Sequence, residues 1–88
     1  MAEVHIASCI ARVRPEALAA CRASIESVIG WPVSATDPIG KLVVVMEGAN
    51  TGALLEQMDR IRALPGVLNI EMVYQHSEVA SAMKELLQ

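Results

Sequence analysis

The chain has 88 residues, a formal net charge of −3 and a composition that is 53% hydrophobic but only 2% aromatic. This length suits one domain and is too short for two. The acidic balance argues against non-specific nucleic-acid binding, which requires a basic surface. The apolar run Leu42–Met46 is far shorter than the roughly 20 residues of a membrane-spanning helix, no other run is longer, and no secretory signal is visible. We therefore expect a small cytoplasmic protein with no direct membrane insertion.

In the N-terminal half, the pattern predicts a strand, a helix and two further strands. Apolar alternation over residues 4–13 predicts the first strand. A helix follows from Arg14, with proline at its first position, and ends at Gly30 as a C-cap. Two strands connected by a turn come next, over residues 33–37 and 41–47.

The C-terminal half repeats the helix–strand order. Asn50 is a suitable N-cap for a helix over residues 51–64, and Pro65-Gly66 ends it. Residues 67–75 form the fourth predicted strand. Helical spacing of apolar residues between Ser77 and Leu87 predicts a possible C-terminal helix.

The resulting order, βαββαβ, predicts an α+β, ferredoxin-like sandwich. Right-handed crossovers favour an antiparallel four-stranded sheet with strand order 4-1-3-2 and both helices on one face. We expect residues 1–78 to form this domain and residues 79–88 to form a tail. The other face of the sheet is then bare.

The bare face has more apolar residues than a solvated sheet normally shows, because such a sheet alternates apolar and polar residues. In the fourth strand, we expect Leu68, Ile70, Met72 and Tyr74 to face the core, leaving residues such as Gln75 facing away. In the first strand, the odd residues from Ala7 to Val13 face the helices. The bare face then carries an apolar patch of Ile6, Ile10, Val43, Val45, Val67 and Val73. Its polar rim consists of Ser8, Arg12, Glu47, Asn69 and Glu71.

An apolar patch with a polar rim indicates an interaction surface. A bound partner, a second copy of the chain or the chain's own tail can each cover it, and the residues alone leave these three open. Catalytic chemistry is not indicated: there is no CxxC pair for a metal, no glycine-rich phosphate loop, and no base beside a serine. Strands one and three also lack the aromatic residues that stack RNA bases. We therefore expect no enzyme activity, no metal, no cofactor and no nucleic-acid partner.

Three segments stand in order and with compatible spacing: His5–Ile10 followed by Arg14-Pro15-Glu16, then Asp37–Glu47, then Leu64–His76. Together they resemble the NapD family of small cytoplasmic chaperones of the periplasmic nitrate reductase. The resemblance implies a protein that binds the twin-arginine signal peptide of the catalytic subunit, NapA. It also implies that export is held back until the molybdenum cofactor is installed.

In this family the peptide is held as a helix against the sheet, which agrees with the bare face. The predicted peptide-binding residues are therefore the patch and rim residues given above. Glu47 and Glu71 are the candidate acceptors for the peptide's arginines. We expect a monomer, with a homodimer possible. The alternative is a small regulatory or ligand-binding module of the same fold that dimerises through its sheet.

Overall fold

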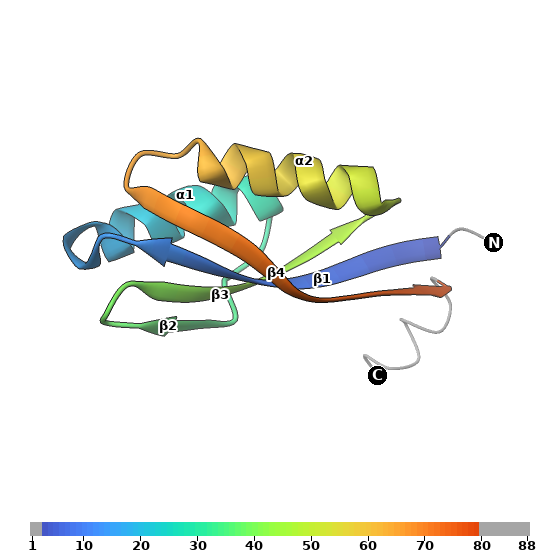
Figure 1. Cartoon of the computed structure of the whole chain (residues 1–88), viewed down its shortest axis with the longest axis horizontal. Coiled ribbons are helices and arrows are strands. Elements are labelled where there is room, and N and C mark those ends of the chain that lie inside the picture. The colour runs from blue at the N-terminus through green and yellow to red at the C-terminus, as the bar shows by residue number, and fades with distance from the viewer. Residues whose placement is uncertain (1–2, 80–88) are drawn as a thin grey trace.

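The computed structural model describes residues 3–79. The elements in chain order are β1 (Glu3–Val13), a 3-10 turn (Pro15–Ala17), α1 (Leu18–Ile29), β2 (Ala35–Asp37), β3 (Lys41–Gly48), α2 (Thr51–Arg62) and β4 (Val67–Val79). The strands form one antiparallel sheet in the order β2-β3-β1-β4, and both helices cover the same side of it (Figure 1). This confirms the predicted α+β fold and its strand order.

The core lies between the sheet and the two helices. Every second residue of β1 faces the helices, and Ala7, Cys9 and Ala11 are completely buried there. Small side chains in this central strand leave room for larger ones from the neighbouring elements, as close packing requires. The core residues of the neighbouring elements are Leu42, Val44 and Met46 of β3, Cys21, Ile25 and Ile29 of α1, Leu54, Met58 and Ile61 of α2, and Ile70 of β4, and all but Cys21 are larger than the cysteine and alanines of β1.

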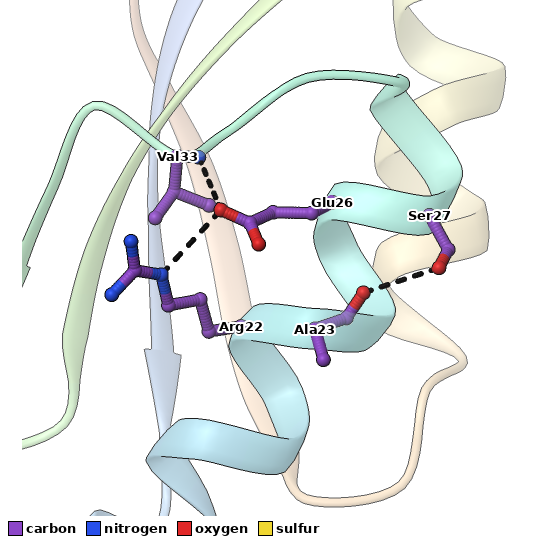
Figure 2. Close-up of polar contacts among 5 residues, drawn as sticks. All are labelled: Arg22, Ala23, Glu26, Ser27 and Val33. Atoms are coloured by element: carbon purple, nitrogen blue, oxygen red, sulfur yellow. Dashed lines mark hydrogen bonds and ion pairs between the residues drawn. The ribbon is translucent and has the colours of Figure 1, made fainter.

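Specific side chains fix the ends of the helices. The Asn50 side-chain oxygen accepts a hydrogen bond of 2.8 Å from the Ala53 N–H, so Asn50 is the N-cap of α2 as predicted. At the end of α1, Glu26 accepts a 2.9 Å hydrogen bond from the Val33 N–H and a 3.4 Å bond from Arg22 Nε (Figure 2). The Glu26 carboxylate therefore ties the segment leading into β2 back onto α1.

The turn between β2 and β3 closes against the end of β1. The Val13 N–H donates to the Gly40 carbonyl oxygen at 2.8 Å. Gly40 has a φ of 105°, and a Cβ at this position would lie 2.2 Å from the Val13 carbonyl oxygen. Only glycine allows this approach, so residue 40 fixes the position of the turn against β1.

The strand β4 differs from the prediction because it contains two irregularities in its pairing with β1. Arg12 pairs with Asn69 but Val13 pairs with Val67, and Ser8 pairs with Tyr74 but Cys9 pairs with Met72. Leu68 and Val73 are the extra residues, and such bulges change which face the following residues occupy. The prediction that side chains alternate between the two faces without interruption through β4 was therefore wrong.

Four residues of β4 are affected. Leu68 and Tyr74, predicted to be in the core, are 60% and 58% exposed. Val67, predicted on the bare face, is partly buried against the core cluster. Gln75, predicted to face away, lies opposite Ala7 and donates through Nε2 to Thr51 Oγ1 of α2 at 2.8 Å.

Several boundaries also differ. Strand β2 begins at Ala35 rather than at residue 33, and α2 ends at Arg62 rather than at residue 64. Ser77 belongs to β4, which continues to Val79, so the predicted C-terminal helix does not begin at Ser77. The rest of that predicted helix, residues 80–88, lies outside the described residues.

Candidate binding face

The side of the sheet opposite α1 and α2 is called the open face here, because no helix within residues 3–79 covers it (Figure 1). Cross-strand pairing defines the residues that share it. They are Ile6, Ser8, Ile10 and Arg12 of β1, Lys41, Val43, Val45 and Glu47 of β3, Ala35 and Asp37 of β2, and Asn69, Glu71, Tyr74 and His76 of β4.

Nine of the eleven predicted site residues lie together on this face. They are Ile6, Ser8, Ile10, Arg12, Val43, Val45, Glu47, Asn69 and Glu71. Val67 does not, because it pairs with the buried Val13 on the helix side. Val73 is 59% exposed at the second bulge of β4.

Tyr74 and His76 were not among the predicted site residues. Their rings are 5.2 Å apart, and they lie opposite Ser8 and Ile6. No glycine or proline occurs within Val67–Val79 to indicate the bulge that places them there. Lys41, in contrast, shares the alternation of Val43, so extending the predicted pattern by one alternate position would have included it.

The central part of the open face is apolar. Ile10, Val43 and Ala35 lie side by side across β1, β3 and β2. Together with Thr36, Asp37 and Lys41 they line a shallow hollow of about 290 Å³. Val45, Ser8 and Tyr74 form the adjoining row. Ile10, Val43 and Val45 are only partly covered, as expected for apolar side chains on an interaction surface.

Charged residues lie at both ends of this apolar region. Arg12 pairs with Lys41, and neither side chain forms an ion pair or hydrogen bond with another residue of the described range. Glu47, exposed at the opposite end of β3, also has no side-chain partner within that range. Glu71 differs, because its Oε1 accepts a 3.0 Å hydrogen bond from Asn69 Nδ2. The rim thus has two cations beside Asp37 at one end and the carboxylate of Glu47 at the other.

The two cysteines lie on the other side of the sheet and are both buried. Burial raises the pKa of the Cys9 thiol and that of Cys21. Cys21 Sγ also donates to the Pro65 carbonyl oxygen at 3.4 Å. A raised pKa disfavours the reactive thiolate, so both residues act as core side chains.

Metal-binding clusters and membrane-spanning helices are both absent from residues 3–79. No group of three or more His, Cys, Asp or Glu side chains there has an arrangement that could hold a metal ion. Within the same range, no helix has the length and apolar character needed to cross a membrane.

The family model and the curated relatives that match this chain point to one family. The family described as NapD protein matches residues 4–79. Chaperone NapD of Haemophilus influenzae is 28% identical over 75 residues, covering 84% of this chain and 81% of the relative. Chaperone NapD of Escherichia coli K12 is 26% identical over 75 residues, covering 84% and 86%.

The fold also matches a solved structure. The solution structure of the E. coli Tat proofreading chaperone protein NapD has a TM-score of 0.74 and 24% identity to this chain, covering 88% of this chain and 81% of that one. This likeness supports the sheet topology and the position of the helices. Because the family match extends over nearly all of the described residues, the chain belongs to the NapD family.

Proposed function

We propose that this chain is a cytoplasmic chaperone that binds the twin-arginine signal peptide of the periplasmic nitrate reductase catalytic subunit, NapA. By holding the peptide, it delays export until the cofactor has been inserted and maturation is complete. The name of the E. coli relative, a Tat proofreading chaperone, supports this role. The observation that carries the proposal is the open face, with its apolar centre and charged ends.

An amphipathic helix is the peptide conformation that fits this face best. A signal peptide of this kind has two arginines followed by an apolar stretch. As a helix, the stretch packs its apolar side on Ile10, Val43 and Val45, in the way that helices occupy apolar grooves. The guanidinium groups then find carboxylates at the rim, which mainly set orientation and association rate.

Binding on the face performs the function by steric masking. Once the peptide lies on the sheet, its arginines are hidden from the translocase, and release occurs by competition. Ordering a disordered peptide offsets much of the gain from apolar burial. A net binding free energy of about −8 to −11 kcal/mol is reasonable, which corresponds to a Kd from about 1 μM to about 10 nM.

A calorimetric titration of the full chain with the synthetic NapA signal peptide tests the proposal. We expect one peptide per chain and a Kd in that range, whereas a scrambled peptide of the same composition should give no binding heat. Absence of binding by the authentic peptide would contradict the proposal. A stable dimer in light scattering that the peptide leaves unchanged would favour the dimeric module instead.

A further inference from the structure

We infer that the bound peptide helix runs parallel to β1, with its arginines beside Glu47 and its C-terminal end beside Arg12 and Lys41. This inference rests on the proposed function and adds the direction of the peptide. Three features of the open face support the same direction: the available carboxylate at one end, the two cations at the other, and the hollow between them.

Glu47 is the carboxylate best placed for the arginines. It lies opposite Ile6, and its side chain has no partner within residues 3–79. The Gln57 side chain donates to its backbone oxygen at 2.8 Å, which holds the strand but leaves the carboxylate available. Glu71 is less suitable for two reasons. Its carboxylate already accepts a hydrogen bond from Asn69, and this bond draws it toward the end of the face where Arg12, directly opposite Asn69, would repel the peptide's arginines.

The end of the face that carries Arg12 and Lys41 favours the C-terminal end of the peptide helix. Arg12 and Lys41 are adjacent across β1 and β3, so an arginine placed there would meet two like charges. The unsatisfied carbonyl groups at a helix C-terminus carry partial negative charge and are stabilised by nearby cations. Asp37 lies in the same row and its Oδ1 accepts the Ile39 N–H at 2.9 Å, but the two cations outnumber this one carboxylate, so the row stays net positive.

The order of groups in the peptide agrees with the order of features along β3. The arginines precede the apolar stretch, and on the face Glu47 precedes the hollow at Val43 when β3 is followed toward Lys41. Glu47 and Val43 are four residue steps apart along the strand, which corresponds to about 13 Å. A helix covers this distance in about nine residues, so an apolar side chain about nine positions after the arginines lies over the hollow. In the reverse direction, the arginines would lie at Lys41.

A paramagnetic label on the peptide tests the direction. With a nitroxide at the peptide N-terminus, the amide resonances of Ile6 and Glu47 should broaden, while those of Arg12 and Lys41 should not. A label at the C-terminus should give the opposite pattern. Calorimetry on the labelled peptides verifies that each still binds. Binding with the reversed broadening pattern would overturn the direction alone, whereas loss of all binding by the unlabelled peptide would overturn the proposed function as well.

Charge reversal provides an independent test. Glu47→Lys should weaken peptide binding about tenfold, whereas Glu71→Lys, at the competing carboxylate of the same face, should weaken it less than about threefold. Both positions are exposed, so folding should be retained and can be checked by circular dichroism. A larger loss for Glu71→Lys than for Glu47→Lys would overturn the assignment of Glu47 as the arginine partner.

Discussion

The Trp31 indole Nε1 donates a 2.7 Å hydrogen bond to the carbonyl oxygen of Val45. Strand β2 pairs with β3 only from Lys41 to Val43, which lies opposite Ala35. Val45 therefore lies on the part of the β3 edge that β2 leaves unpaired. Exposed strand edges can pair with other chains, and proteins cover them in specific ways. Here the Trp31 side chain, from the segment after α1, occupies one carbonyl oxygen of this free edge.

Replacing Trp31 with phenylalanine keeps an aromatic ring but removes this donor. We expect Trp31→Phe to lower the free energy of unfolding by about 1 kcal/mol, the usual contribution of one hydrogen bond. Self-association should also increase, because the Val45 carbonyl becomes available to a second chain. Urea denaturation and light scattering measure the two effects. An unchanged urea midpoint together with an unchanged scattering mass would contradict this role of Trp31.

Two glycines with positive φ allow a matched comparison. Gly40→Ala should destabilise the chain by roughly 3 kcal/mol or more, because its Cβ would lie 2.2 Å from the Val13 carbonyl oxygen. Gly30 has a φ of 85° but no atom within 4 Å of an added Cβ, so Gly30→Ala should cost only about 1 kcal/mol. Thermal unfolding of the two variants measures the difference. Equal losses would show that backbone conformation, and not the close approach, determines the requirement for glycine at residue 40.

The buried thiols predict an alkaline loss of stability. Burial raises the pKa of Cys9 and of Cys21, whereas unfolded thiols ionise at about 8.5. Above that pH, the unfolded state loses protons that the folded state retains, so the free energy of unfolding falls as pH rises. Below that pH, the thiols are protonated in both states, so their contribution to the free energy of unfolding is present in full. Urea denaturation at several pH values should show a smaller fall in the free energy of unfolding between about pH 8 and pH 10 for Cys9→Ala than for the unsubstituted chain. The same dependence on pH in both proteins would contradict an origin in the buried thiol.

The fold was predictable from the sequence because its helices and strands have clear boundaries. Asn50 and Gly30 provide helix caps, and the alternation in β1 and β3 assigns their two faces correctly. The face of β4 was not predictable, since its two bulges depend on pairing with β1 and leave no local mark in the sequence. As a result, Tyr74 was assigned to the core and Val67 to the open face.

The Trp31 hydrogen bond was also beyond sequence reasoning. Its acceptor is a backbone oxygen 14 residues away, and no residue type at Val45 can indicate which carbonyl lies on a free edge. Such contacts depend on the length of β2, which is three residues. The apolar centre of the open face, in contrast, follows from the unbroken apolar run Leu42–Met46, which places apolar side chains on both faces of β3.

The claim that the open face binds the peptide is tested most directly by paired calorimetric titrations. Ile10→Asp places a charge in the apolar centre, and Tyr74→Ser removes a 58% exposed ring from the same face. The control, Leu55→Asp, changes a 50% exposed leucine of α2, on the helix side. We predict that Ile10→Asp abolishes binding, that Tyr74→Ser weakens it several-fold, and that Leu55→Asp leaves the Kd unchanged, all with native circular dichroism. Unchanged affinity in both open-face variants would contradict the account.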